Sequence, residues 1–533
     1  MEMGTGKVMA SAGVVGGFTM VSRVLGLIRD MLMAGVFGMS LHMSAFVVAF
    51  TIPNLFRRLF GEGALSAAFM PVFIETRARE GDASAWGLAR NVLSLVAVFL
   101  TAVVVIGIVG ITLVLWLGEG GEKTELTLSL SRVMLPYMVF ICLAALCMAL
   151  LNAYHHFATP AAAPALLNVV WIAAVVLVVP CLDSMNARIH AVAWAVLLAG
   201  LLQAGIQIPR MMQYGYRPGL SLRVGDEKVR RILHLMGPAS IGMAVTQINV
   251  LLDRLMAVWI GVWAPAALFF AERLIYLPQG LFATALSTVL LPVFSGQAAR
   301  ADHTRLRETV RYSLCNLLYV MIPASAGLLV LAVPIVQMIF ERNAFTEAST
   351  AMTALALQCY APGLLVFSLS KVFVPAFYAM QDTRTPLRTG LVAVCVKLGC
   401  SVVLIMTLPT HLKHGGLAAA TVIGEGVNGI LLGYMLHRRV GSPGWGTILK
   451  TAARCLGASV IMAWASWRSH HLLAGWMQEP WGEDHVFSSV APVLGAIGVG
   501  IAVYTVATWL LRAPEIRAVS GALKRRWRRG TSA

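Results

Sequence analysis

Several arginines lie inside segments that are otherwise apolar enough to cross a membrane. Arg57 and Arg58 occur in the stretch "PNLFRRLFGEG", which separates two almost wholly apolar runs. A charge at the centre of a membrane helix costs roughly 2.5–3.5 kcal/mol on insertion scales, so residues kept there are functional candidates. A guanidinium group donates two parallel hydrogen bonds and therefore suits a phosphate. The pattern predicts an anion-binding site within the membrane, with candidate substrate contacts at Arg23, Arg29, Arg57 and Arg273.

The depth of these arginines follows from their spacing. Arg23 and Arg57 each lie about 13 residues from the outer end of an apolar segment, which places both roughly 20 Å deep at about 1.5 Å per residue. Arg57 and Arg273 have no carboxylate three or four residues away, although Glu272 adjoins Arg273. Since an uncompensated guanidinium cannot face lipid, we expect all three to line a water-filled cavity and bind an anion. An alternative is that these arginines pair with acids on other helices or extend to the lipid headgroups.

Acidic residues near the arginines are candidates for supporting or gating roles. Arg58 and Glu62 have the i,i+4 spacing that allows an ion pair on one helix face. Asp30 directly follows Arg29, but adjacent helical residues point in different directions, so we do not expect these two to pair. The supporting or gating candidates are Asp30, Arg58, Glu62 and Glu272.

A second set of polar residues could couple transport to an ion. Glu425 and Asn428 occur together in "IGEGVNG", and Asp253 and Lys371 lie in other apolar segments. An ionisable residue inside the membrane is a functional candidate by default, so these four are candidates for ion coupling. A structural pair between Glu425 and either Lys397 or Lys371 explains the pattern equally well.

Composition indicates an all-α polytopic membrane protein. Of the 533 residues, 58% are hydrophobic and only 12% are charged, whereas soluble proteins carry about 25% charged residues. Apolar runs long enough to cross a bilayer recur about fourteen times. Lysine and arginine concentrate in the even-numbered connections and the C-terminal tail, which places both termini in the cytoplasm. The basic tail "KRRWRRG" either binds anionic phospholipids or stays in water.

The sequence also repeats itself. "LSAAFMPVF" at 65–73 matches "LSTVLLPVF" at 286–294, an offset of 221, and Pro136 aligns with Pro362, an offset of 226. The repeated unit holds an even number of spans, so both copies run in the same direction, and transporter sites lie where such repeats meet. We expect an N-lobe (1–211, spans 1–6), a cytoplasmic linker (212–229), a C-lobe (230–440, spans 7–12), two extra helices (441–512, spans 13–14) and a basic tail (513–533).

The sequence contains no constellation for catalysis or cofactor binding. It lacks the motifs G-x-x-x-x-G-K-[ST] and H-E-x-x-H, and its 8 cysteines are scattered through apolar stretches. We therefore expect a transporter with no cofactor, no metal site and no nucleic-acid partner, driven by the membrane potential or an ion gradient.

Three stretches carry a resemblance to a known family. "SRVLGLIRD" at 22–30, "AFTIPNLFRRLFGEGALSAAFMPVF" at 49–73 and "AERLIYLPQGLFATALSTVLLPVFS" at 271–295 resemble the MurJ (MviN) lipid II flippases of the MOP exporter superfamily. The similarity covers nearly the whole chain, and the arginine-rich motif is highly specific. The resemblance implies two helical lobes around a cationic cavity, with spans 13 and 14 forming a groove for a polyprenyl tail.

The resemblance also implies an activity. Such proteins move lipid II, the undecaprenyl-diphosphate-linked peptidoglycan precursor, from the cytoplasmic to the periplasmic leaflet of the bacterial inner membrane by alternating access. Many members have an aspartate where this chain has Ser44, and the acids that could replace it are Asp30, Glu62 and Glu272. The family's functional arginines match Arg23, Arg29, Arg57 and Arg273.

Other functions fit the same outline less well. One is export of another polyprenyl-linked glycan, or of multidrug cations, by a related MOP transporter. A cation antiporter needs acids in its cavity, but arginines outnumber acids in spans 1, 2 and 8. A polyprenyl-phosphate transferase would need a catalytic acid or metal site, and none is evident. The expected partners are lipid II, anionic phospholipids and cell-wall synthesis proteins, and the expected state is a monomer.

Overall fold

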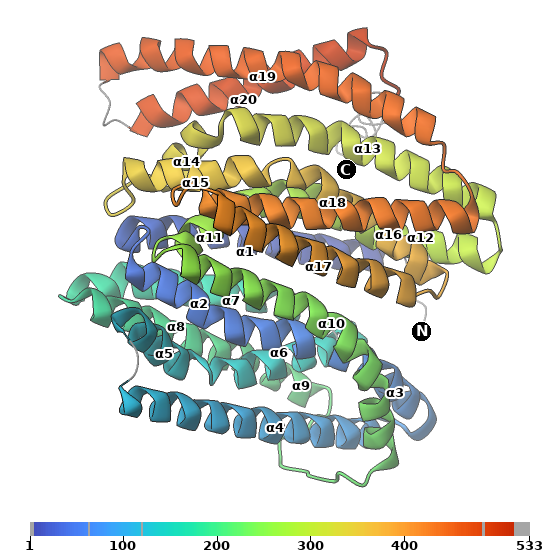
Figure 1. The fold of residues 1–533 in the computed structure, drawn as a ribbon. Coiled ribbons are helices and arrows are strands. Elements are labelled where there is room, and N and C mark those ends of the chain that lie inside the picture. The colour runs from blue at the N-terminus through green and yellow to red at the C-terminus, as the bar shows by residue number, and fades with distance from the viewer. Residues whose placement is uncertain (1–4, 62–63, 119–120, 482–485, 516–533) are drawn as a thin grey trace. The chain divides into compact units, whose positions relative to one another are not determined.

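The computed structural model describes residues 5–61, 64–118, 121–481 and 486–515, and these residues form helices joined by short turns (Figure 1). Within the described residues, nine helices are long and apolar enough to cross a membrane, or up to eleven if each bent pair is one span. The expected all-α membrane fold is therefore confirmed. Glu62 and most of the predicted basic tail lie outside the described residues.

Helix contacts divide the chain into two compact units, Met1–Ala266 and Ala267–Ala533. In the first unit, α1 packs on α7, and α6 packs on α8. Its elements are α1 Thr5–Phe37, α2 Leu41–Phe56, η1 Arg57–Gly61, α3 Ala64–Glu80, α4 Asp82–Leu117, α5 Glu122–Met134, α6 Tyr137–Ala153, α7 Ala158–Ala173, η2 Ala174–Val178, η3 Val179–Cys181, α8 Met185–Gly205, α9 Ile208–Gln213 and α10 Glu227–Ile260.

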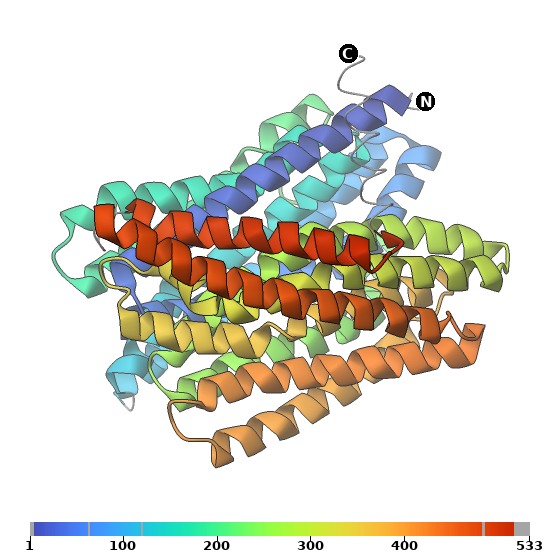
Figure 2. The same cartoon turned by 90° about the horizontal axis from the view of Figure 1, so that it is seen from above.

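In the second unit, α19 packs along both α20 and α13, and α17 packs on α18. Figure 2 shows α19 and α20 running side by side at the red end of the colour scale. The elements are α11 Ala264–Pro278, which begins in the last residues of the first unit, η4 Gln279–Thr284, α12 Ala285–Ala299, α13 His303–Val330, α14 Ala332–Phe340, α15 Glu347–Tyr360, α16 Gly363–Ala379, α17 Arg384–Thr407, α18 Lys413–Val440, α19 Trp445–Trp481 and α20 Val486–Leu510.

Helix starts follow from side chains that accept hydrogen bonds from otherwise unpaired backbone N–H groups. Ser40 caps α2, Asp226 caps α10 and Asp302 caps α13 in this way. Gly118 ends α4 with a positive φ of 68°, a conformation that costs glycine little. Capping side chains and a glycine turn therefore set the ends of these long helices.

Bends in the helices recur at the repeat offset predicted from the sequence. The pair α5 and α6 is bent by 40° next to Pro136, and the pair α15 and α16 is bent by 43° next to Pro362. Proline removes a backbone donor and its ring clashes with the preceding turn, so a bend is expected at both places.

The turns that end these bent pairs also match. After α6, the amide of His156 donates to the carbonyl of Leu151, and His155 has a φ of 59°. After α16, the amide of Asp382 donates to the carbonyl of Phe377, and Gln381 has the same φ of 59°. Equivalent backbone bonds thus close α6 and α16, at positions separated by the same offset as the two prolines.

The seventh predicted span, α10, packs against α3 and, to a smaller extent, α2 and α4. It therefore belongs to the first unit by its contacts. The predicted lobe boundary at residue 211 is a different division, because it groups helices by repeat and not by contact. Figure 1 shows α10 beside α3.

Candidate functional site

Arg57 lies where a helix changes its winding. Pro53 lies within α2 and supplies no backbone N–H, and four residues later the chain enters the π-helical turn η1. The Arg57 amide donates to the carbonyls of Pro53 and Asn54. A π turn inserts a residue into the helical register, so the residues on its two sides no longer follow one face, and such turns are frequent at functional sites.

The side chain of Arg57 is half-buried and anchored at one end. Its Nε donates to Asn54 Oδ1 at 2.9 Å. Cys142 Sγ, on α6, donates to the neighbouring Phe56 carbonyl at 3.6 Å, so α6 packs on this turn. Arg58 is also half-buried. Its predicted partner Glu62 lies outside the described residues, so the ion pair between them stays a prediction.

A π-helical turn also follows the segment that carries Arg273. α11 ends at Pro278, and η4 begins at the next residue. Arg273 is half-buried, and its Cζ lies 4.3 Å from the centroid of the Phe269 ring, one turn earlier. An aromatic face attracts a guanidinium and fixes its plane. The preceding Glu272 accepts a weak hydrogen bond from the Tyr360 hydroxyl at 3.4 Å.

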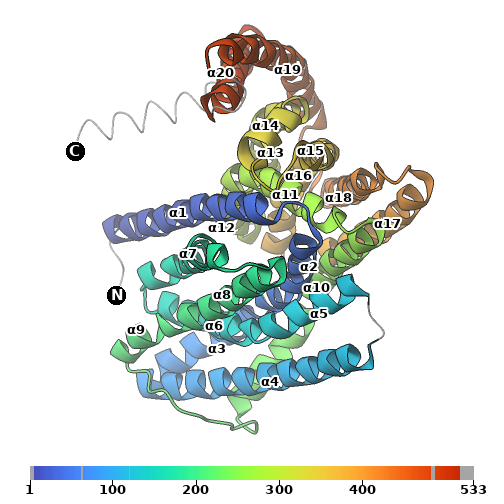
Figure 3. The same ribbon diagram turned by 90° about the vertical axis from the view of Figure 1, so that its left-hand side faces the viewer.

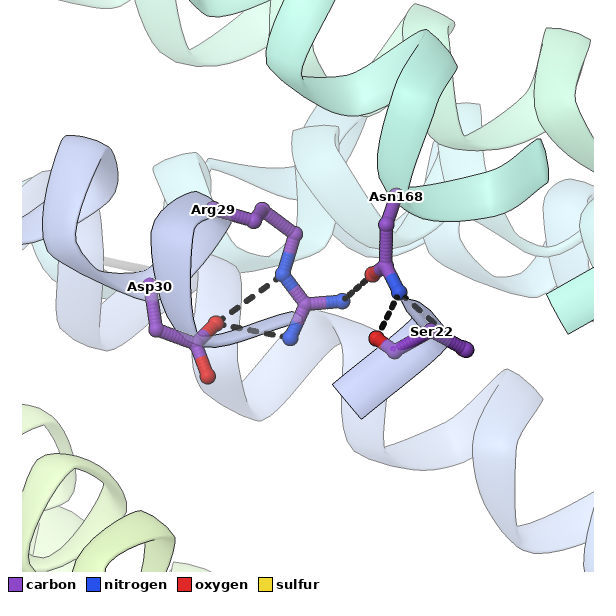
Figure 4. A network of polar contacts seen from close by, with 4 residues as sticks. All are labelled: Ser22, Arg29, Asp30 and Asn168. Carbon is purple, nitrogen blue, oxygen red and sulfur yellow. Dashed lines mark hydrogen bonds and ion pairs between the residues drawn. The ribbon is translucent and has the colours of Figure 1, made fainter. Parts of the chain in front are cut away.

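Arg29 is held by a polar network between α1 and α7 (Figure 4). Its Nε and Nη2 donate to Asp30 Oδ1 at 2.9 and 2.7 Å, and its Nη1 donates to Asn168 Oδ1 at 3.0 Å. The prediction that Arg29 and Asp30 do not pair was therefore wrong. The spacing rule describes which side chains face each other on a helix, but the arginine side chain is long enough to curve around its own helix and reach the adjacent carboxylate.

Asn168 completes this network and was missed by the sequence reasoning. Its Nδ2 donates to the Ser22 carbonyl at 2.9 Å, and Arg29 lies over the Trp171 ring at 4.4 Å. Arg29 is only 8% exposed, so these contacts replace most of its hydration. A lone asparagine in the apolar stretch "PAAAPALLNVVWIA" of α7 was the available signal.

Removal of Asn168 should destabilise the first unit. Asn168→Ala leaves the buried Arg29 Nη1 and the Ser22 carbonyl each short of a partner, at a cost of about 1–3 kcal/mol. We expect a lower Tm in detergent micelles than for the wild type, while Val169→Ala on the exposed neighbouring position changes little. An unchanged Tm for Asn168→Ala would show that the network contributes nothing to stability.

Arg23 differs from Arg29 in its surroundings. It is half-buried on α1, and within the described parts of the chain no hydrogen bond or ion pair holds its guanidinium. Ser44 is buried at 1% exposure, and its hydroxyl has no hydrogen-bond partner in the described region. Asp30 is buried against Arg29 and is thus already engaged.

The candidates for ion coupling are only partly brought together. Asn428 Nδ2 donates to Glu425 Oε2 at 3.5 Å within α18. Lys371 lies on α16, which packs on α18. Lys397 is buried on α17 beside the Gly424 backbone, where an added Cβ would lie 2.7 Å from the Lys397 Cβ. Asp253 is half-buried on α10, in the first unit.

Comparison of the fold with solved structures defines the class of protein. The chain is similar to an inward-facing multidrug resistance MATE family transporter of the MOP superfamily, with a TM-score of 0.65 and 16% identity, covering 81% of this chain and 96% of that one. It is also similar to a structure titled "Lipid II flippase MurJ, inward closed conformation", with a TM-score of 0.77 and 24% identity over 94% and 99% of the two chains. The fold is therefore that of the MOP transporters.

Sequence comparison then gives the family. The family model described as "Lipid II flippase MurJ" matches residues 33–481. The lipid II flippase MurJ of Burkholderia cenocepacia is 34% identical over 466 residues, covering 84% of this chain and 87% of the relative. The probable lipid II flippase MurJ of Vibrio cholerae is 32% identical over 519 residues, covering 95% and 96%. The chain belongs to the MurJ lipid II flippase family.

Proposed function

We propose that this chain is a transporter that moves lipid II from the cytoplasmic to the periplasmic leaflet of a bacterial inner membrane by alternating access. The observation that carries the proposal is family membership over most of the chain, together with arginines placed on helices broken by π turns. The cargo is an amphiphile with a diphosphate, and guanidinium groups are suited to that anion. Catalysis has no part in this function.

The proposal is tested by replacing the resident flippase of a bacterium with this chain. After depletion of the resident protein, the chain should restore growth and keep lipid II accessible in the periplasmic leaflet. Accumulation of lipid II in the cytoplasmic leaflet, despite normal amounts of the protein in the membrane, would contradict the proposal.

We infer a finer architecture of about fourteen spans, made of two parallel repeats of about six spans and two extra C-terminal helices. The matched bends at Pro136 and Pro362, and the matched turns after α6 and α16, support the repeat. The π turns η1 and η4 are also separated in the sequence by close to the repeat offset. Broken helices in corresponding positions of two repeats mark the binding sites of many transporters.

We propose Arg23, Arg57 and Arg273 as direct contacts to the diphosphate, because each is half-buried and can still be reached by an anion. Arg29 is proposed as a substrate contact that must first exchange a bond to Asp30 or Asn168 for one to the cargo. Arg58, Glu62 and Glu272 are proposed to support the helices that present these arginines, and Asp30 to hold Arg29.

The proposed location is the bacterial inner membrane, with both termini in the cytoplasm. Cysteines introduced at positions 120, 344 and 481 should react with an impermeant reagent added to the periplasm, and those at 82, 220 and 303 should not. Labelling of position 220 in intact cells would overturn this orientation. The proposed mature state is a monomer that meets anionic phospholipids at its basic tail and cell-wall synthesis proteins at its product side.

We propose further that no cofactor takes part and that the membrane potential or an ion gradient drives the cycle. Glu425 and Asn428 share one turn of α18 and form the most compact of the ion-coupling candidates. Lys371 on the neighbouring α16 and Asp253 on α10 are the other two. An inward-directed electrical field would act on any charge that these groups carry through the membrane.

A further inference from the structure

Residues 214–226, named here the strap, form neither helix nor strand and run along α4 (Figure 3). Trp86 Nε1 on α4 donates to the Tyr214 carbonyl at 2.6 Å. The Trp86 ring stacks on Tyr154, the residue that directly follows α6, with ring centroids 5.0 Å apart. The start of the strap is thus fixed to a partly buried aromatic cluster that joins α4 to the end of α6.

The middle of the strap is bound by neutral side chains of α4. Asn91 Nδ2 donates to the Arg223 carbonyl at 3.0 Å, and Asn91 Oδ1 accepts from the Arg223 amide at 2.8 Å. Ser94 Oγ accepts from the Ser221 amide at 3.1 Å. Asn91 is 2% exposed, so its hydrogen bonds to the strap are shielded from water, and release of the strap would break both of them.

The helix that follows the strap is joined to α3 by a different kind of contact. Lys228 Nζ lies 2.5 Å from Glu80 Oε2, and Arg231 Nη1 lies 2.9 Å from Glu75 Oε2. The side chains of Arg231 and Glu75 are 58% and 33% exposed. Exposed ion pairs contribute little to stability and are screened by salt, so they break easily.

The far end of α10 has an anchor of its own. Lys123 Nζ, in the first turn of α5, donates to the Val258 carbonyl in the last turn of α10 at 2.6 Å. A lysine at a helix C-terminus satisfies a free carbonyl and complements the helix dipole. α10 is therefore held at both ends within the first unit, by a partly buried lysine at one end and exposed ion pairs at the other.

We propose that the two ion pairs Glu75–Arg231 and Glu80–Lys228 form a latch that opens and closes the path between α3 and α10 during each transport cycle. The strap stays bound to α4 throughout and limits how far the start of α10 moves. The inference rests on the proposed function, because a cargo whose lipid tail remains in the membrane must pass sideways between two helices. Because the hydrogen bonds of the strap are buried and the ion pairs of the latch are exposed, we expect the ion pairs to break before the hydrogen bonds.

A cross-linking experiment separates the latch from the strap. In full-length protein with the exposed Cys181 and Cys395 replaced by serine, one variant carries Glu75→Cys and Arg231→Cys, and the matched control carries Ser94→Cys and Ser221→Cys. Both pairs are joined with the same short bifunctional thiol reagent, and lipid II transport is measured in proteoliposomes. We expect joining to abolish transport in the latch variant and to leave the strap variant at its rate before joining.

Each outcome decides a part of the proposal. Unchanged transport by the joined latch variant would overturn the latch, and lost transport by the joined control would overturn the permanently bound strap. Because replacement of charged residues can itself disturb folding, the charge exchange Glu80→Lys with Lys228→Glu serves as a second variant. It should restore the transport that either single reversal loses, and failure to restore it in folded protein would contradict the ion-pair latch.

A distance measurement keeps the latch separate from the identity of the cargo. Spin labels are placed at the exposed positions Ala78 of α3 and His234 of α10. Pulsed electron paramagnetic resonance then measures the distance between the two helices in nanodiscs. We expect a short and a long distance, with Glu75→Gln and Glu80→Gln together shifting the population to the long one. A single unchanged distance would overturn the latch, whereas a shift without lipid II transport would reject only the proposed function.

Discussion

Arg57→Ala is expected to abolish lipid II flipping in cells that contain normal amounts of the protein. The residue is the first of the π turn η1, its Nε donates to Asn54 Oδ1, and its side chain is half-buried at the place where the helix changes its winding. A charge-assisted hydrogen bond contributes about 1.5–3 kcal/mol, and a bidentate contact to phosphate forms two of them. The measurement is complementation after depletion of the resident flippase, with protein abundance determined in the membrane fraction.

Arg58→Ala is the matched control, because it removes the same charge from the adjacent position. Its predicted partner is Glu62, four residues later in the sequence, and not the cargo, so the substitution should lower protein abundance or Tm while the surviving protein still transports. The assignment of the two roles is reversed if Arg58→Ala is inactive at full abundance and Arg57→Ala complements.

Local rules were sufficient for much of the fold. The prolines at 136 and 362 were recognised as repeat equivalents, and both lie at the bends of their helix pairs. Proline acts through its own backbone chemistry, so its effect is readable without knowledge of the neighbouring helices. The same holds for the all-α membrane class, which follows from the length and apolar character of the segments.

Contacts between distant segments could not be read in this way. Asn168 reaches Arg29 across 139 positions, and Asn91 reaches Arg223 across 132. No helical spacing rule connects such pairs, because their proximity is created by packing of α1 on α7 and of the strap on α4. The pairing of Arg29 with Asp30 failed for another reason, since the rule for helix neighbours neglects the reach of a long side chain.

The linker prediction illustrates the same limit. Residues 212–229, with Arg217, Arg223 and Lys228, were expected to form a cytoplasmic linker, and the sequence alone predicted no contacts for it. Three α4 side chains bind backbone groups of this segment, and the rings of Tyr214 and Tyr216 pack against those of Tyr154 and Trp86. The signal was divided between the two segments, because Trp86, Asn91 and Ser94 lie on α4 and the two tyrosines lie in the linker.

Arg273→Lys is expected to weaken binding of the lipid-linked diphosphate on the order of tenfold, and Arg273→Ala more strongly. Lysine keeps the charge but lacks the planar guanidinium, which donates two parallel hydrogen bonds and stacks on the Phe269 ring. The measurement is binding of lipid II to purified protein in nanodiscs. Equal affinity of the Arg273→Lys variant and the wild type would mean that charge alone matters at this position.

The same assay shows which part of the cargo is recognised. If the arginines read the diphosphate, undecaprenyl diphosphate should compete with lipid II for the wild-type protein, and a neutral polyprenol of equal length should not. Competition should weaken in Arg273→Ala, because that variant lacks one of the donors that the diphosphate uses. Phe269→Leu serves as the control that keeps the arginine but removes its aromatic support, so its affinity should lie between those of the wild type and Arg273→Ala. Equal competition by the neutral polyprenol would mean that burial of the tail dominates binding, and the arginines would then need another explanation.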